Sequence, residues 1–195
     1  MQLMALDSLG SLFQGLLLTR YLSDQPEAMS LRVVQARDLE CLYIGEKLES
    51  FSLLVSSSSL KRYVLQKGDV VLSVRGASQR VSVVDQCSVG AIAGTNLAVF
   101  RPSERLDSLF LAVLLGSDWL SGALSRLYGQ SSGTRSVSLA QLRLLEVPVP
   151  SLAVQREVGA LFLALERFRM ATLGTLESRQ QLAELSLIKL LGKRG

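Results

Sequence analysis

The architecture is decided in the C-terminal part of the chain, where residues 152–191 read LAVQREVGALFLALERFRMATLGTLESRQQLAELSLIKLL. No proline interrupts this stretch, and its only weak helix formers are Gly159 and Gly174. We predict one continuous helix. At about 1.5 Å per residue, its ~40 residues form a rod of roughly 60 Å.

Apolar residues recur along this predicted helix at steps of four and three, which is the spacing of a coiled-coil seam. The steps are regular from Val154 to Phe168, and after a five-residue step the pattern resumes at Leu173. The predicted seam and dimer interface consists of Val154, Val158, Leu161, Leu165, Phe168, Leu173, Leu176, Ala183, Leu187 and Leu190. A domain of about 150 residues is too small to cover a rod of this length, and we find no second long helix, so a second copy of the chain is the expected partner. The alternative is a helix that folds back onto its own domain.

The residues before Pro102 are β-rich. The predicted strands are Leu31–Val34, Val70–Val74, Arg80–Asp85 and Asn96–Phe100. A helix is then expected from Ser108 to about Leu124, with Asp107 as its N-cap. Further on, Ser138 should cap a short helix over residues 139–146, and the prolines should keep residues 147–150 extended. The sequence therefore predicts an α+β fold, with a β-rich domain over residues 1–150 and a long coiled-coil helix over residues 151–195.

Composition excludes several classes of protein. Of the 195 residues, 48% are apolar and 19% are charged, which provides enough apolar surface for a folded core. The longest apolar run, Leu109–Leu115, is far shorter than the ~18 residues of a membrane span. The N-terminus lacks the pattern of a signal peptide, so we expect a cytoplasmic protein without membrane contact.

The sequence contains no histidine and only two cysteines, Cys41 and Cys87. Catalysis by Ser–His–Asp or Cys–His groups and the common zinc sites are therefore excluded within this chain. Residues 129–133 match the G-x-S-x-G pattern of hydrolases, but they lie in a predicted loop between helices and have no histidine base. Phosphate-binding glycine loops are absent as well. We therefore predict a protein that is not an enzyme and binds no metal or cofactor.

Basic residues are concentrated in two blocks, although the net charge is only +4. Residues 61–80 carry five basic residues against Asp69, and residues 126–143 carry three arginines and no acid. If these blocks meet in space, they form a face that attracts phosphates. Ordinary solvated surface charge is the alternative.

Two segments within these blocks carry groups that hold phosphates or read base edges. Residues 67–76 predict a turn and a buried strand that emerges at an arginine beside a glycine, and residues 129–135 are small and polar. We predict DNA contacts by Lys61, Arg62, Arg75, Ser78, Gln79, Arg80, Gln130, Ser131, Thr134 and Arg135.

Taken together, these segments resemble the DNA-specificity subunit of Type I restriction–modification systems. The resemblance begins with the segments at residues 10–15, 32–39, 67–76 and 95–100. It continues through the glycine–threonine loop at Gly133, the short helix, the V-P-x-P segment at residues 147–150 and the early glutamine, Gln155. This order of motifs corresponds to one target-recognition domain followed by one conserved helix.

A full specificity subunit has two recognition domains and two antiparallel helices, so the resemblance implies a half-subunit that pairs with a second copy. It also implies that the chain binds double-stranded DNA at a bipartite site and docks onto methyltransferase and restriction subunits. S-adenosylmethionine would bind only to the methyltransferase. The paired helices would then set the spacing between half-sites. Another hypothesis is a regulatory or protein-interaction module that derives from this family and no longer reads DNA.

Overall fold

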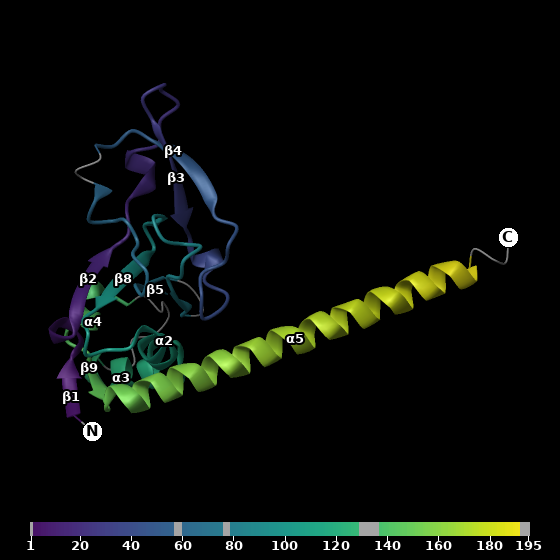
Figure 1. Cartoon of the computed structure of the whole chain (residues 1–195). Coiled ribbons are helices and arrows are strands. Elements are labelled where there is room, and N and C mark those ends of the chain that lie inside the picture. The colour runs from purple at the N-terminus through teal and green to yellow at the C-terminus, as the bar shows by residue number, and fades with distance from the viewer. Residues whose placement is uncertain (1, 57–59, 76–78, 129–136, 192–195) are drawn as a thin grey trace. The chain divides into compact units, whose positions relative to one another are not determined.

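The computed structural model describes residues 2–56, 60–75, 79–128 and 137–191. The chain divides into two compact units, Met1–Gly159 and Ala160–Gly195. We call the first unit the head. The division falls within one long helix, so the first turns of that helix belong to the head. Figure 1 shows the elements of both units.

The described part of the head contains three sheets. Their strands are β1 (Gln2–Ala5), β2 (Gly10–Gln14), β3 (Met29–Val34), β4 (Glu49–Leu53), β5 (Val70–Ser73), β6 (Val81–Val83), β7 (Ile92–Ala93), β8 (Leu97–Pro102) and β9 (Glu146–Val149). The largest sheet is antiparallel and has the order β2-β8-β5-β6. A three-stranded sheet has the order β4-β3-β7, and β1 pairs with β9. The mixed α+β class is therefore confirmed.

The helices agree with the predicted caps and differ in their lengths. They are α2 (Ser108–Gly116), α3 (Asp118–Tyr128), α4 (Leu139–Arg143) and α5 (Leu152–Leu191). The Asp107 side chain accepts a hydrogen bond from the Phe110 amide, and Ser138 forms a capping box with Gln141. The predicted helix after Ser108 is instead two helices, because Ser117 is extended and ends α2. The short helix also ends earlier than predicted, since β9 already begins at Glu146.

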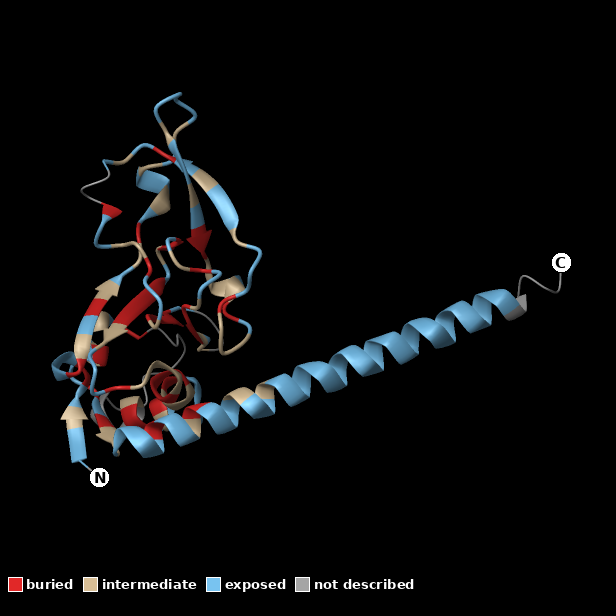
Figure 2. Cartoon of the chain, in the orientation of Figure 1, coloured by how far each residue is buried: buried red, intermediate tan, exposed pale blue. Residues whose placement is uncertain are grey.

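The central strands of the four-stranded sheet are buried on both faces. Along β5, Val70 and Leu72 belong to the core beneath α2 and α3, while Val71 belongs to a second core that includes Val34 and Ala93. Alternate residues of a strand point to opposite faces, so an almost entirely apolar strand fits this position. Figure 2 shows β5 and β8 as mostly buried. This rigid sheet provides the frame for the loops at its ends.

A buried ion pair locks the turn before β5 to β8. Asp69 is 1% exposed, and its carboxylate accepts two hydrogen bonds of 2.8 Å from Arg101. The hydrogen bond to Asp69 raises the pKa of Arg101, and this effect exceeds the opposing effect of burial. Arg101 also donates to the Val64 carbonyl. Both partners therefore have a structural role.

The start of α5 is fixed within the head by one buried side chain. Gln155 is 1% exposed. Its Oε1 accepts from the Asp107 amide at 2.7 Å, and its Nε2 donates to the carbonyls of Arg105 and Pro150. One turn later, Gly159 lies so close to α2 that an added Cβ would stand 2.8 Å from Leu109 Cβ. The first turns of α5 are therefore specifically docked.

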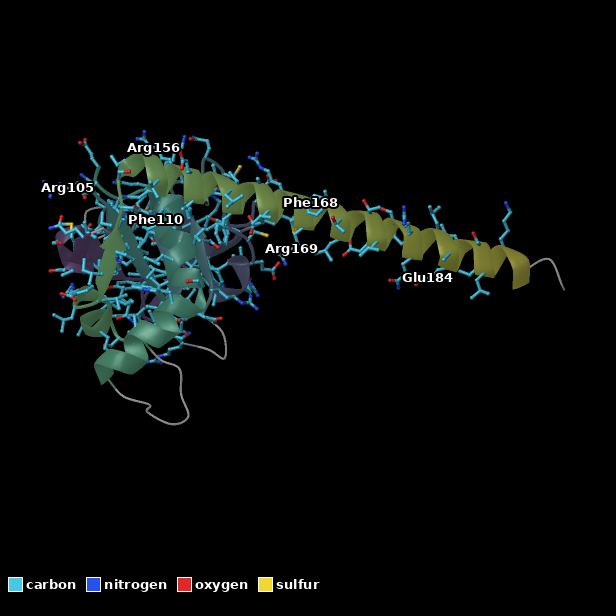
Figure 3. All side chains as sticks on the ribbon, turned by 90° about the horizontal axis from the view of Figure 1, so that it is seen from below. Arg105, Phe110, Arg156, Phe168, Arg169 and Glu184 are labelled. Carbon is cyan, nitrogen blue, oxygen red and sulfur yellow. The ribbon has the colours of Figure 1, made fainter. Side chains whose placement is uncertain are left out.

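The second unit, taken by itself, is the remainder of α5. The predicted continuous helix is confirmed over Leu152–Leu191. Every described side chain from residue 167 to residue 189 is exposed (Figure 2). Phe168 and Glu184 both stand out from the ribbon in Figure 3. Exposed apolar residues also lie outside the predicted seam: Phe162, Met170, Leu182, Leu185 and Ile188. This unit therefore has apolar side chains on more than one side of the helix.

Candidate nucleic-acid interface

One end of the four-stranded sheet carries the β5–β6 connection, which includes the predicted contacts Arg75, Gln79 and Arg80. Ala98 of β8 is opposite Gln14 of β2 on one side and Leu72 of β5 on the other. The last residues of β2 and β5 therefore lie at the same end of the sheet as the first residues of β8 and β6. We call this end the loop end.

Val137, the first described residue after the second predicted recognition segment, is hydrogen-bonded to the end of the first segment at the loop end. The Val137 amide, which follows the second segment, donates to the Val74 carbonyl at 3.0 Å, directly before Arg75. Arg80 is joined to Ser73 by two hydrogen bonds of 2.9 Å, which continue the pairing of β5 with β6. Arg75 and Arg80 are exposed, and Gln79 is half-buried. The remaining predicted contacts lie outside the described residues: Ser78, Gln130, Ser131, Thr134 and Arg135.

A groove of about 590 Å³ runs along the β2 side of the loop end. Its floor comes from β2 and from the following residues through Tyr21, and its walls come from the turn at Arg62 and from α4. We call it the Arg–Tyr groove. It is lined by Leu12, Phe13, Gln14, Gly15, Leu16, Leu17, Arg20, Tyr21, Arg62, Tyr63, Thr95, Leu139 and Arg143.

Two arginines of this groove rest on tyrosine rings. The Arg62 guanidinium lies 4.6 Å from the centre of the Tyr63 ring, and its Nη2 donates to the Tyr63 hydroxyl at 2.7 Å. The Arg20 guanidinium lies 5.9 Å from the centre of the Tyr21 ring. Such contacts stabilise the charged guanidinium group and restrict the movement of the long side chain. The arrangement therefore holds two guanidinium groups beside the groove.

Several arginines elsewhere in the head are already engaged. Arg32 donates to the carbonyls of Cys87 and Val89, Arg37 pairs with Glu49, and Arg101 pairs with Asp69. In contrast, Arg20 and Arg62 have no carboxylate partner among the described residues. Arg143 lies 3.6 Å from Asp7, and both of these side chains are more than half exposed. The loop end therefore carries cationic side chains that remain available to an anion, although exposed Arg105 at the opposite end of the sheet is also without a carboxylate partner among the described residues.

Most of the chain matches the model of one known protein family. Residues 48–178 match the family model described as the Type I restriction modification DNA specificity domain, and they make up more than half of the chain. The chain belongs to this family. Among curated proteins, no sequence matches this specificity-domain chain.

Solved structures show the same fold at low sequence identity. The HsdS subunit from Thermoanaerobacter tengcongensis matches with a TM-score of 0.58 and 18% identity, over 87% of this chain and 38% of that chain. A structure described as the basis of complex assembly and conformational transition of the type I R-M system matches with a TM-score of 0.58 and 21% identity, over 88% and 41%. The S subunit of a Type I system from M. genitalium matches with a TM-score of 0.50 and 15% identity, over 85% and 39%. The specificity-domain chain thus spans about two fifths of the length of these structures.

Sequence reasoning found some of the available cations of the specificity-domain chain and missed others. Lys61 and Arg62 are exposed in the turn that leads to Tyr63, as a surface contact requires. It did not name Arg20, Tyr21 and Tyr63 as possible contacts, and it counted Arg143 only within the second basic block. A signal for the first three was present, because residues 18–21 and 60–63 share the pattern Leu-x-Arg-Tyr.

Two further observations concern other kinds of site. The described residues contain no group of three or more histidine, cysteine, aspartate or glutamate side chains placed to hold a metal ion. Within the same part of the chain, no helix is both long enough and apolar enough to cross a membrane.

Proposed function

We propose that this chain is the DNA-reading component of a Type I restriction–modification system and has no catalytic role of its own. The observation that carries the proposal is the loop end, where exposed Arg75 and Arg80 lie at the β5–β6 connection and Arg20 and Arg62 lack acidic partners among the described residues. Membership of the specificity-domain family supports the same conclusion. Methyltransferase and restriction subunits would supply the chemistry, and S-adenosylmethionine would bind to the methyltransferase.

In this proposal the loop end performs two tasks. Lys61 and Arg62 hold phosphates, which contributes affinity without sequence information. Arg75 and Arg80 are exposed near the β5–β6 connection and reach base edges. Gln79, whose Nε2 is buried without a hydrogen-bond partner among the described residues, turns outward to join them. Each well-placed pair with a base contributes about 1–3 kcal/mol of discrimination. The rigid sheet beneath these residues keeps their positions fixed while the duplex binds.

DNA binding by the chain together with its methyltransferase subunit tests this proposal. A binding sequence is first selected from a library of random duplexes, and its affinity is then measured at increasing salt. We expect affinity to fall steeply with salt, and we expect Arg75→Ala to weaken binding to the selected sequence by about 1–3 kcal/mol.

Arg105→Ala is the matched control, since Arg105 is exposed and follows β8 at the opposite end of the sheet. Its affinity should equal that of the wild type. Binding that does not depend on salt, or a library that yields no preferred sequence, would contradict the DNA-reading role. The second outcome would favour a protein-interaction module instead.

We propose in addition that α5 pairs with the same helix of a second copy in antiparallel orientation. In support, seam residues of the second unit are largely exposed, among them Leu165 at 54% and Phe168 at 72%. Val158 lies closer to the head, where it packs partly buried against the core, and the Leu190 side chain is not described. A two-fold pair would present two loop ends to a palindromic bipartite site.

The oligomeric state tests this pairing. Light scattering at micromolar concentration should give twice the chain mass of 21.2 kDa. The double variant Leu165→Glu/Phe168→Glu should give the mass of one chain, because buried charges oppose the pairing. Gln181→Glu places a charge on the side of the helix away from the seam and should leave the dimer intact. A wild-type chain that is monomeric under these conditions would disprove the pairing.

A further inference from the structure

We infer that the Arg–Tyr groove binds the sugar–phosphate backbone of one strand of the DNA duplex. The inference rests on the proposed function and adds a contact area that is distinct from the base-reading residues near the β5–β6 connection. Its central residues are Arg20, Tyr21, Arg62, Tyr63 and Arg143.

The Arg–Tyr groove is positively charged. Three arginines line the groove, and none of its lining residues is acidic. Arg143 donates to the Leu12 carbonyl at 3.3 Å and lies 3.6 Å from Asp7 in an exposed geometry, where an ion pair contributes little. Cations gathered in a concave surface attract anions more strongly than scattered ones do. A phosphodiester supplies the charge and the acceptor oxygens that guanidinium groups fit best.

The guanidinium groups of Arg20 and Arg62 are held in place before DNA binds. Arg62 uses one donor on the Tyr63 hydroxyl and rests on the same ring, so its position is restricted while other donors remain available. Arg20 rests on Tyr21 in the same manner. Restricting these side chains beforehand lowers the entropy that binding would otherwise cost.

The lining of the groove also suits the sugar of a nucleotide. Gln14 donates to the Thr95 carbonyl, and Thr95 donates to the Leu16 carbonyl, so the floor is internally bonded. Aliphatic and aromatic surface lies between the cations, which suits the apolar face of a deoxyribose. A volume of about 590 Å³ falls in the ~300–1,000 Å³ range of sites that hold small organic groups.

The distance between the groove and the base-reading residues also suits a DNA duplex. The groove lies at β2, while the base-reading residues lie at β5 and β6, two to three strands away in the same sheet. At about 4.8 Å per strand, this separation is roughly 10–15 Å. The major groove of B-DNA is about 12 Å wide. A duplex whose major groove faces Arg75 therefore brings a flanking backbone to the β2 side of the sheet, where the Arg–Tyr groove lies.

The test uses the double variant Arg20→Ala/Arg62→Ala in the full chain with its methyltransferase subunit. Affinity is measured against salt on the selected duplex and on a random-sequence duplex. Each lost phosphate contact lowers the slope of log K against log salt by about 0.9, so the double variant should lower it by about 1.8 on both duplexes. Arg20→Lys/Arg62→Lys should restore most of the slope, since it keeps the charge. Arg105→Ala should leave the slope unchanged.

A second measurement locates the contacts on the DNA. Single phosphates of the selected duplex are replaced by neutral methylphosphonates. Positions beside the recognition sequence should weaken the wild type and leave the double variant unaffected. Thermal unfolding of each variant verifies that the head is folded.

The outcomes separate this inference from the proposed function. If the wild type selects a sequence and the double variant keeps the full salt slope, the groove assignment is wrong and DNA reading stands. A loss confined to the selected duplex would mean that these arginines read bases, which also overturns the backbone assignment. A wild type that fails to bind DNA would overturn both proposals.

Discussion

The two ends of α5 belong to one continuous helix and differ in burial and in their contacts with other elements. In the first turns, Gln155 is buried with its amide fully bonded, and Gly159 lies against α2. In the second unit, an added Cβ at Gly174 would meet no atom within 4 Å apart from its chain neighbours and the backbone of its own helix. Side chains there are mostly exposed (Figure 2), and Figure 3 shows Phe168 pointing away from the ribbon.

This difference separates helix formation from helix docking. Helix formation depends on local features, namely the absence of proline and a run of good helix formers. Docking depends on single residues whose partners are about 50 positions away in the sequence, such as Gln155 with Asp107. Substitutions at Gln155 and Gly159 should therefore be costly, while the exposed positions of the second unit should tolerate many until a partner covers them.

The largest effect should follow from Gln155→Ala. The substitution leaves the Asp107 amide and the carbonyls of Arg105 and Pro150 without their partner in a buried place. Because unsatisfied buried groups cost about 1–3 kcal/mol each when water cannot reach them, we expect the head to lose about 2–3 kcal/mol of unfolding free energy. Urea unfolding followed by the fluorescence of the single tryptophan, Trp119, measures this loss.

Gln181→Ala serves as the matched control in the second unit. Gln181 is exposed, so its removal should change the unfolding free energy by less than about 0.5 kcal/mol. If both variants lose the same unfolding free energy, the docked and exposed ends of α5 contribute equally to stability. That result would contradict a specifically docked start of α5.

The long helix and the helix caps were predictable because their causes are local. The boundaries Leu152 and Leu191 follow from the end of the proline-containing segment and from the unbroken run behind it. Asp107 and Ser138 were identified as caps from residue type and spacing alone. The central strands were equally clear, since β5 and β8 are apolar on both faces.

Long-range pairing was harder to predict. The extended segment around Pro148 was expected, but its partner β1 lies at the other end of the chain. Nothing within residues 2–5 identifies that partner. The strand β2 was missed for a similar reason, because its alternation is weak and its pairing with β8 is formed across most of the domain.

The candidate site shows the same limit. Charge counting located Lys61, Arg62 and Arg75, because they are close together in sequence. It did not separate available arginines from engaged ones, since Arg32 and Arg101 acquire partners only in the folded head. Arg20 and Arg143 lie far from the basic stretch at residues 61–80, and only the fold brings them to one groove.

A smaller effect, of opposite sign at the two ends of α5, should follow from replacing its glycines by alanine. Alanine favours a helix over glycine by about 1 kcal/mol. At Gly174 nothing opposes this gain, so Gly174→Ala should stabilise the helix by up to about 1 kcal/mol. At Gly159 the new methyl group would stand 2.8 Å from Leu109 Cβ and 3.3 Å from the Asp107 carboxylate. Since neither atom is the free end of a flexible side chain, α5 must shift from α2, and we expect a net loss of about 1–2 kcal/mol.

Thermal unfolding monitored by far-ultraviolet circular dichroism measures both changes on the same chain. Gly174 lies on the side of the helix away from the seam, so a change in self-association should not obscure its effect. Stabilisation by both substitutions would show that the start of α5 is free to move off α2 at no cost. In that case the hydrogen bonds of Gln155, rather than the close approach at Gly159, would be what positions the helix on the head.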